Sequence, residues 1–500
     1  MQMDIGTLLW AVSYVVVFFW FTLYGIHRYY MIATFLRHRK NEPAPMAEYV
    51  HLPLVTVQLP VYNERYVVER LMQAVSELDY PRELLQVQLL DDSNDDSRDL
   101  VDRKAEELRA AGLDIEVLRR EDRVGYKAGA LAYGLKRARG EFLFILDADF
   151  VPSPGILKST VHYFTDPKIG MIQTRWGHLN RTHSMLTRVQ AMFLDGHLLL
   201  EQTARSRSGR FFNFNGTAGL WRKSCIEEAG GWQHDTLTED LDLSYRAQLK
   251  GWRFVFLPRE VTPAELPVDM NGFKSQQHRW TKGSIQTCKK LLPRIWKAKL
   301  PLPIKLEATI HLTSNFMYLL MAFLCLLLNP HAPNPFPPEY KLYLIDLPVF
   351  LSASLSVVAF YLCAQCALHP RAWFREILYL PVLLALGIGL SVNNARAVLE
   401  AVFNHETGFN RTPKYGSESI GRNWHRLTYR PLDTLLPWME MLFAAYFTYC
   451  VVHAIVIGQF FSVPFLLLFQ FGFLYVACSS LYVHLKRSWM VGNRRTLPAT

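Results

Sequence analysis

Acidic residues stand in pairs where predicted secondary-structure elements begin or end. The three pairs are Asp91 with Asp92, Asp147 with Asp149, and Glu239 with Asp240. A single acidic residue in such a place is commonly a turn or capping residue. If the three pairs gather on one side of a parallel sheet, they indicate instead a site that handles charge. Glu239 and Asp240 open an amphipathic stretch, for which Thr238 is a candidate N-cap.

The spacing of Asp147 and Asp149 suits a divalent metal ion. In an extended strand, residues i and i+2 point the same way. Both carboxylates can then face a Mg²⁺ or Mn²⁺ that keeps several waters and holds a diphosphate. Such an ion would offset the charge of a departing nucleotide. Asp240 has no partner carboxylate at this spacing on its N-terminal side, which suits a lone general base.

Basic and aromatic residues could supply the complementary groups. Lys127, between two glycines at a predicted helix start, is well placed for phosphate. In "KSQQHRWTKG", Gln276, Arg279 and Trp280 share one face if the stretch is helical. An amide, a flat ring and a guanidinium together can bind a sugar and a phosphate. The alternative is an amphipathic helix with a Trp at a membrane interface.

Composition indicates soluble and membrane parts in one chain. Half of the 500 residues are apolar, while 20% are charged, and the net charge is +10. Many cations cluster beside apolar runs, which argues against nucleic acid as a partner. The seven cysteines imply no disulfide framework. Cys363 and Cys366 lie in an apolar run and are expected to be membrane-core side chains.

The chain divides into three regions. Residues 1–40 hold an uncharged apolar run followed by cations, which predicts a transmembrane helix with its N-terminus outside. Residues 41–300 alternate short β-rich runs with helical ones, which predicts an α/β domain with a mostly parallel, doubly wound sheet in the cytoplasm. Residues 301–500 are expected to cross the membrane four times, through 308–328, 347–368, 436–457 and 460–483. The shorter run 377–392, within 371–400, is expected to lie at the cytoplasmic interface.

Five motifs in this order resemble those of the processive family 2 glycosyltransferases. They are "QLPVYNE", "DDS", "DAD", "TED" and "QQHRW", and the likeness covers Pro53–Lys414. The sequence is most similar to cellulose-synthase-like proteins that make mannan or xyloglucan backbones, and also resembles bacterial cellulose synthase. The resemblance implies a GT-A nucleotide-sugar fold, a divalent metal, and inverting transfer to a growing polysaccharide fed into a membrane channel.

The resemblance also implies roles for individual residues. Those at the nucleotide-sugar donor would be Asp91, Asp92, Asp147 and Arg279, with Asp147 and Asp149 holding the metal. Lys127 is expected at the donor as well, from its place at the predicted helix start. Those at the acceptor would be Gln276 and Trp280, with Phe212, Asn215 and Gly216 in a finger-like segment. Asp240 would be the catalytic base, with Glu239 beside it in the same motif.

The loop at about 405–418 matches a gating loop of this family. Its "FNRTPK" resembles F-x-V-T-x-K, with Arg411 in the place of the usual Val. By resemblance, Thr412 and Lys414 would reach the bound diphosphate. Pro413 should stiffen the loop, because proline fixes its own φ and restricts Thr412.

The predicted protein is therefore an integral protein of a plasma or inner membrane. It would polymerise a β-linked, β-1,4 glucan or mannan from UDP-glucose or GDP-mannose and pass the chain across the bilayer. One alternative is a non-processive enzyme that adds a single sugar to a lipid. Another is a catalytically silent membrane scaffold or channel. The sequence does not identify any protein subunits that accompany it.

Overall fold

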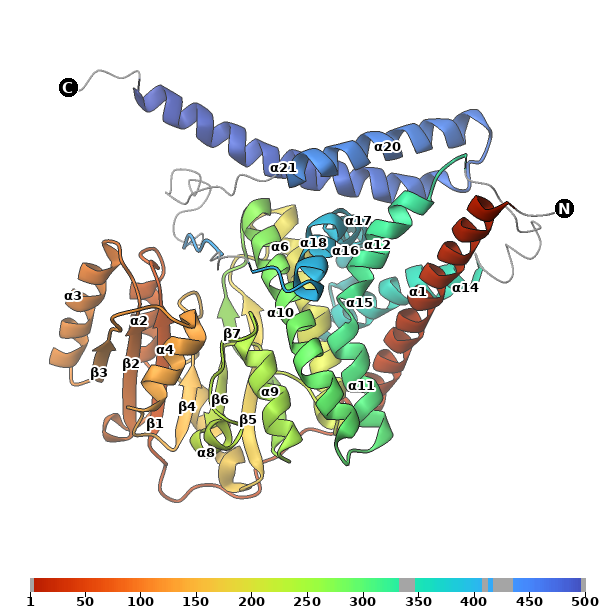
Figure 1. The fold of residues 1–500 in the computed structure, drawn as a ribbon. Coiled ribbons are helices and arrows are strands. Elements are labelled where there is room, and N and C mark those ends of the chain that lie inside the picture. Colours follow the sequence, from red (N-terminus) through yellow and green to blue (C-terminus); the bar gives the residue numbers. More distant parts are fainter. Residues whose placement is uncertain (1–3, 332–346, 407–411, 417–434, 496–500) are drawn as a thin grey trace.

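The computed structural model describes residues 4–331, 347–406, 412–416 and 435–495. An α/β domain built around one sheet lies beside a group of long apolar helices (Figure 1). Of the predicted gating loop, Thr412–Gly416 is described, while Phe409, Asn410 and Arg411 lie outside the described residues.

The sheet has seven strands in the order β3-β2-β1-β4-β6-β5-β7. The strands are β1 Val55–Val61, β2 Leu85–Asp91, β3 Asp114–Leu118, β4 Phe142–Ile145, β5 Ile169–His178, β6 Gly219–Arg222 and β7 Arg253–Ala264. Strand β1 pairs in parallel with β2 and β4, β2 with β3, and β5 with β7, whereas β6 is antiparallel to both of its neighbours. The predicted mostly parallel α/β fold is confirmed, with β6 as the exception.

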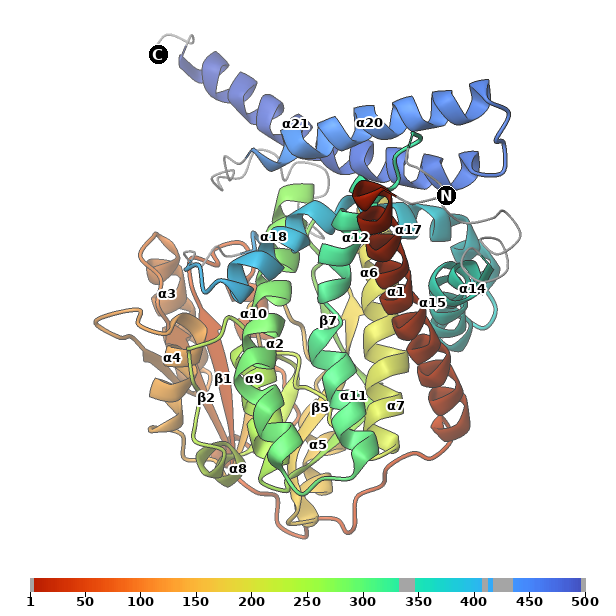
Figure 2. The same cartoon turned by 45° about the vertical axis from the view of Figure 1, so that its right-hand side comes forward.

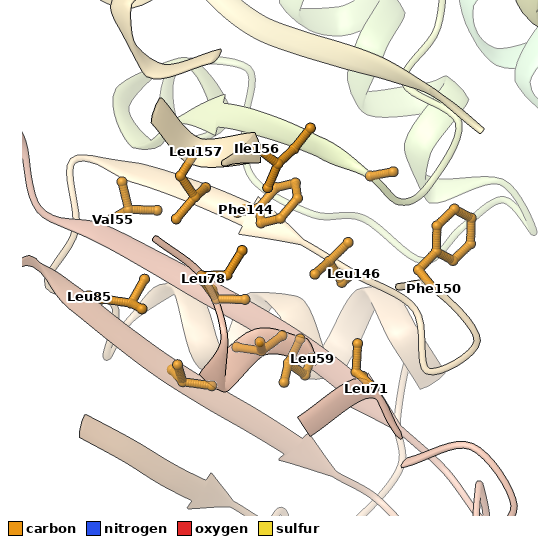
Figure 3. Packing of buried hydrophobic residues seen from close by; sticks show 14 of the residues in the cluster. Val55, Leu59, Leu71, Leu78, Leu85, Phe144, Leu146, Phe150, Ile156 and Leu157 are labelled. Carbon is orange, nitrogen blue, oxygen red and sulfur yellow. The ribbon is translucent and has the colours of Figure 1, made fainter. Parts of the chain in front are cut away.

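Helices cover the sheet and bury its apolar faces. Those of the α/β domain are α2 Val68–Ser76, α3 Ser97–Ala110, α4 Tyr126–Leu135, α5 Ile156–Val161, α6 Met185–Asp195, α7 Gln202–Arg207, α8 Lys223–Glu228, α9 Glu239–Leu249 and α10 Met270–Lys297. A π-helical turn, η3 Gly196–Glu201, joins α6 to α7. Between the sheet and α5, Phe144 and Leu59 pack with Leu157 in a closed apolar cluster (Figure 3). This rigid core fixes the loops that leave the strands.

Three strand ends meet at one edge of the sheet. In the parallel register, Val61 at the end of β1 stands opposite Asp91 at the end of β2, and β4 follows β1 on the other side. Strand β1 has a parallel neighbour on each side, β2 and β4, so the order of the strands reverses at β1. Open α/β sheets bind ligands at such a switch point. The acidic pairs after β2 and β4 therefore come close together, as the sequence indicated.

Helix α10 is the longest helix of the α/β domain and lies against α9, α11 and α18 (Figure 2). The Asp269 side chain accepts a hydrogen bond from Gly272 N and caps its start. At α9, Thr238 occupies the N-cap position, but its side chain makes no capping hydrogen bond, which corrects that expectation. Its hydroxyl lies 3.4 Å from the Thr287 hydroxyl on α10 instead.

The apolar helices include four that are long and apolar enough to cross a membrane. These are Ile5–His38 (α1), Leu347–Leu368 (α14 Leu347–Val349, η5 Phe350–Ser354 and α15 Leu355–Leu368), Leu436–Val456 (α20) and Val463–Tyr482 of α21 Val463–Arg495. Two bent pairs raise the number to six if each is one span: α11 Leu302–Thr313 with α12 Phe316–Leu327, and residues 373–389 with α18 Ser391–Val402. The expected five spans fall within this range, and the composition is compatible with a membrane protein.

Two expected apolar helices are bent. The run 308–328 is divided between α11 and α12, whose axes differ by 54°. The expected interface helix is α16 Trp373–Glu376, η6 Ile377–Tyr379 and α17 Leu380–Gly389, followed after a 40° bend by α18. An ideal Cβ on Gly389 would lie 2.4 Å from Gly472 O, so α17 and α21 pack backbone to backbone.

Candidate active site

A cleft of about 200 Å³ opens at the carboxyl ends of the strands. Of the predicted site residues, those that line it are Asp92, Lys127, Asp147, Asp149, Asn215, Gly216, Glu239, Asp240, Gln276, Arg279, Trp280, Thr412 and Lys414. They come from seven separate stretches of the chain. The structure therefore brings together all but two of the predicted residues, Asp91 and Phe212.

Asp147 and Asp149 lie in a turn after β4 rather than in the strand. Strand β4 ends at Ile145, and Phe150 N donates to Asp147 O across the turn. The expected strand geometry is therefore wrong, although both carboxylates still line the cleft. Each faces a lysine: Lys127 Nζ lies 2.6 Å from Asp147 Oδ1, and Lys414 Nζ lies 2.7 Å from Asp149 Oδ1.

The ion pairs favour the charged forms of Asp147 and Lys414. Burial opposes charge on Asp147, but the attraction of Lys127 and Lys414 outweighs it, so the pKa of Asp147 lies below its ordinary value. Burial likewise acts against the ammonium of Lys414, yet Asp149 and Glu64 raise its pKa overall. The site thus holds two carboxylates and two ammonium groups within one small volume.

The donor set fits a hard divalent cation. Asp147 and Asp149 offer carboxylate oxygens, the ligands that Mg²⁺ and Mn²⁺ prefer. Among the described residues, no group of three or more His, Cys, Asp or Glu side chains forms a metal cage. A site with only two protein carboxylates suits an ion that completes its shell with water and phosphate oxygens.

Asp240 lies in the first turn of α9, against a glycine of the opposite wall. Burial and the negative charge of Glu239 raise the pKa of Asp240 to about 7, against the opposing effect of Lys127. A carboxyl group with such a pKa can accept a proton near neutral pH. Gly216 has a φ of +82°, and an ideal Cβ there would lie 2.9 Å from Asp240 Oδ2. Only glycine allows this approach without strain.

Helix α10 presents the predicted amide, guanidinium and indole to the cleft. Gln276, Arg279 and Trp280 share one face, as the spacing predicted. Burial lowers the pKa of Arg279, and the nearby carboxylates of Glu239 and Asp147 act against this shift. An ideal Cβ on Gly283, one turn further on, would lie 2.5 Å from Thr238 Cγ2. This glycine lets α10 pack directly on the turn that leads into Asp240.

The segment Thr412–Gly416 forms one wall of the cleft. The Thr412 hydroxyl is buried and has no hydrogen-bond partner among the described residues. Gly416 N donates to Glu265 Oε2 at 2.9 Å, and the Tyr415 hydroxyl donates to Asp269 Oδ2 at 3.3 Å. The segment is thus fixed to the connection between β7 and α10, with Thr412 and Lys414 directed at the cleft.

Asp91 and Asp92 have different surroundings. Asp91 is fully buried, accepts from Arg119 Nε at 2.8 Å and from Ser93 N, and does not line the cleft. Asp91 was predicted to contact the nucleotide-sugar donor; in the structure its carboxylate instead orders the loop that follows β2. Asp92 does line the cleft, and Arg120 holds its carboxylate through two nitrogens.

Phe212 is also away from the cleft. It is 1% exposed and packs edge to face against Phe254 in the apolar core. Gln248 fixes its backbone by hydrogen bonds to both N and O. The prediction that the Phe212 side chain contacts the acceptor directly is therefore wrong. Asn215 lies on the cleft, and its side-chain Oδ1 accepts from Gln202 Nε2 at 3.0 Å.

Several lining residues had no predicted role. The guanidinium of Arg123 lies 3.3 Å from the centroid of the Tyr62 ring, and both groups line the cleft beside Asp92. Trp176 and Glu64 also line it. Tyr62 and Glu64 belong to the "QLPVYNE" motif, and this motif was the sequence signal that could have identified them as site residues. Trp176, at the end of β5, stands in no motif.

Comparison with known proteins agrees with this geometry. Residues 53–283 match the family described as "Glycosyltransferase like family 2". The chain is 41% identical over 254 residues to "Glucomannan 4-beta-mannosyltransferase 2" of Arabidopsis thaliana, covering 50% of this chain and 48% of that protein. It is 39% identical over 303 residues to "Glucomannan 4-beta-mannosyltransferase 1" of Oryza sativa subsp. japonica, covering 58% and 57%. The chain thus spans about half the length of the curated relatives it matches.

A solved structure shares the fold. It is titled "Mannosyltransferase PcManGT from Pyrobaculum calidifontis in complex with GDP-Man and Mn2+". The two superpose with a TM-score of 0.52 and 21% sequence identity, over 78% of this chain and 99% of that one. With the mostly parallel sheet, this likeness shows a GT-A fold, and residues 53–283 of the chain match the glycosyltransferase family 2 model.

Proposed function

We propose that the protein is an inverting, membrane-embedded glycosyltransferase that polymerises a β-1,4-linked mannan from GDP-mannose. The carrying observation is the cleft, which is lined by Asp240 and by the Asp147 and Asp149 carboxylates with their lysine partners. The mannosyl-transferring relatives favour GDP-mannose over UDP-glucose among the donors that the sequence leaves open.

Asp240 acts as the general base. An acceptor hydroxyl attacks the anomeric carbon, the bond from that carbon to the diphosphate oxygen breaks, and the proton passes to the Asp240 carboxylate. The pKa of about 7 suits this step, because the carboxylate is available at neutral pH and still takes up a proton. One attack from the face opposite the leaving group inverts the anomeric configuration.

Cationic side chains stabilise the leaving diphosphate. Lys127, Lys414 and Arg279 all line the cleft near Asp147. A divalent cation held by Asp147 and Asp149 would offset further negative charge on the nucleotide. The Thr412 hydroxyl, which has no hydrogen-bond partner among the described residues, adds a donor at the wall of the cleft.

Trp280 and Gln276 hold the acceptor sugar. The indole is only partly buried and offers a flat surface for a sugar ring at the wall of the cleft formed by α10. Binding of the terminal sugar there would bring its hydroxyl toward Asp240, since α10 packs on the turn before that residue.

The decisive experiment is transfer by the purified protein from separate GDP-mannose, UDP-glucose and UDP-N-acetylglucosamine, with the product sized and digested by an endo-β-1,4-mannanase. Long, digestible product from GDP-mannose alone supports the proposal. A single transferred sugar on a lipid would replace the polymerase with a lipid-modifying enzyme. No transfer from any donor would favour the silent scaffold.

The variant Asp240→Asn is the matched control for that assay. Removal of the base should lower turnover by about 10²–10⁴-fold, while binding of GDP changes little. Asn keeps the size of the side chain and removes its charge, so the fold is preserved. Product at the wild-type rate from this variant would exclude Asp240 as the base.

We further propose that the N-terminus lies outside the membrane and the α/β domain in the cytoplasm. Trp10 Nε1, near the start of α1, donates to Leu327 O at the end of α12, so these two helix ends lie together on one side. The Tyr446 hydroxyl, in the middle of α20, donates to Leu328 O beside them. Figure 1 draws this side away from the sheet. An impermeant maleimide on intact cells should label Ile5→Cys and spare Lys299→Cys, in a chain with Cys478→Ser. The opposite pattern would invert the topology.

A further inference from the structure

Helix α10 has a second polar face that the proposed reaction does not use. While Gln276, Arg279 and Trp280 line the cleft, another stripe on the same helix contacts the apolar helices. Its members are Asn271, Lys274, His278, Lys282 and Lys289, at spacings of three, four, four and seven residues. Such spacing keeps side chains on one side of a helix.

Lys274 forms a buried ion pair with the helix that follows Thr412–Gly416 in the chain. Its Nζ lies 2.6 Å from Glu440 Oε1 and 2.9 Å from Oε2 on α20. The side chains are 6% and 0% exposed. A carboxylate in an apolar helix is costly and points to a function, with its partner as the first candidate for that function.

Glu400 binds α10 from the helix that precedes the same segment. It lies on α18 and contacts Lys282 Nζ at 3.2 Å and His278 Nε2 at 3.0 Å. Lys282 Nζ also donates to His405 O at 2.7 Å, just beyond the end of α18. Further along α10, Lys289 Nζ donates to the last carbonyl groups of α18.

The start of α10 touches the segment itself. Tyr415 donates to Asp269 Oδ2, and the ring of Pro413 lies beside Gly272 in the first turn. Two turns later the helix carries Arg279 and Trp280. One rigid helix therefore contacts Thr412–Gly416 and the helices before and after it in the chain, and it also bears two of the cleft residues.

We infer that the Lys274–Glu440 and Lys282–Glu400 pairs are positioning pairs, which set the distance between Arg279 on α10 and Lys414 in the segment Thr412–Gly416. This inference rests on the proposed function, in which both cations meet one diphosphate. A buried ion pair adds little net stability compared with apolar side chains of similar size. It does restrict how two helices sit against each other, because each charge must find its partner.

The test compares four variants of the 500-residue chain in lipid nanodiscs. They are Lys274→Met, Glu440→Leu, the double variant, and the exchanged pair Lys274→Glu with Glu440→Lys. Initial rates over a range of GDP-mannose concentrations give KM and kcat, and thermal unfolding reports stability. The double apolar variant should fold, since it leaves no unpaired buried charge.

The single variants and the double variant should raise KM for the donor by roughly tenfold with a smaller change in kcat, the size of effect found for residues that couple sites. The exchanged pair should restore KM, because the charges again meet. Glu307→Gln is the matched control: it removes a carboxylate, 3% exposed, that pairs with Arg205 and His27 away from α10. It should lower the unfolding temperature and leave KM unchanged.

Two results would overturn the inference. Either KM stays at the wild-type value in the double variant, or the exchanged pair fails to restore KM although it unfolds at the wild-type temperature. Failure of the proposed function looks different, because the wild-type protein would then show no transfer from GDP-mannose. Binding of GDP, measured in parallel, should weaken in the single variants and recover in the exchanged pair.

Discussion

The carboxylate of Asp240 stands directly over Gly216, so that an ideal Cβ on residue 216 would lie 2.9 Å from Asp240 Oδ2 and 3.5 Å from Lys127 Nζ. Gly216 also provides a backbone oxygen that accepts from Lys127 Nζ at 2.7 Å. This glycine therefore sets the spacing between the base of the proposed reaction and the lysine beside Asp147.

Gly216→Ala should impair both stability and turnover. The φ of +82° is unfavourable for alanine and costs about 1–3 kcal/mol, and the new methyl group pushes against Asp240. We expect a lower unfolding temperature and a kcat reduced more than the affinity for GDP. Gly209→Ala, with a φ of +69° and no atoms within 4 Å of the added Cβ, is the control for backbone strain alone. Equal loss of kcat in both variants would remove the special role of Gly216.

Activity should depend on the charge of Asp240. Because burial and Glu239 raise its pKa to about 7, the group is deprotonated above that pH and protonated below it. A base must be deprotonated, so kcat/KM should fall as pH drops below about 7, by about tenfold per pH unit. Glu239→Gln removes one cause of the raised pKa of Asp240, so the fall in kcat/KM should begin at a lower pH. If kcat/KM falls at the same pH in that variant as in the wild type, a group other than Asp240 controls the pH dependence.

The sequence predicted which charged residues line the cleft better than how they pair with one another. Asp92, Asp147 and Asp240 follow or begin elements whose ends share one edge of a parallel sheet, so their convergence follows from the fold class. Their partners come from distant loops: Arg120 reaches Asp92 across 28 residues, and Lys414 reaches Asp149 from beyond the apolar helices. No local pattern specifies such contacts.

Local sequence patterns also did not predict the direction of helices or which individual side chains are buried. Apolar composition predicts that 308–328 is helical, but the 54° bend between α11 and α12 depends on packing against neighbours. Phe212 lies in "FFNFNG" next to residues that reach the cleft, and only the tertiary fold turns its ring into the core. The turn at Asp147–Asp149 likewise replaces a strand that the apolar run predicted.

Lys414 should compete with a divalent cation for Asp149. Its ammonium lies 2.7 Å from Asp149 Oδ1, and a charge at such a distance contributes on the order of 1–4 kcal/mol. Lys414→Met should therefore bind Mn²⁺ roughly tenfold more tightly without nucleotide, as measured by the loss of the free Mn²⁺ signal in electron paramagnetic resonance. Affinity for GDP should fall in the same variant, since a cation near the diphosphate is lost.

Lys305→Met is the comparison for the Lys414 experiment. Lys305 lies on α11 and donates to Trp296 O, away from the cleft. It should leave Mn²⁺ binding unchanged. Weaker or equal Mn²⁺ binding by Lys414→Met would show that the ammonium does not occupy the position of the metal.

Trp280 should matter for the acceptor more than for the donor. Its ring lines the cleft on α10, and its removal would leave Asp240 and the cations in place. Trp280→Ala should lower polymer formation by about 10- to 100-fold through lost positioning, while hydrolysis of GDP-mannose changes little. Trp296→Ala on the same helix is the matched control, because that ring is 44% exposed and bonds to Thr309 away from the cleft. If Trp280→Ala reduces hydrolysis and polymer formation equally, the indole supports the fold of α10 rather than the sugar, and the acceptor site must be sought on another wall of the cleft.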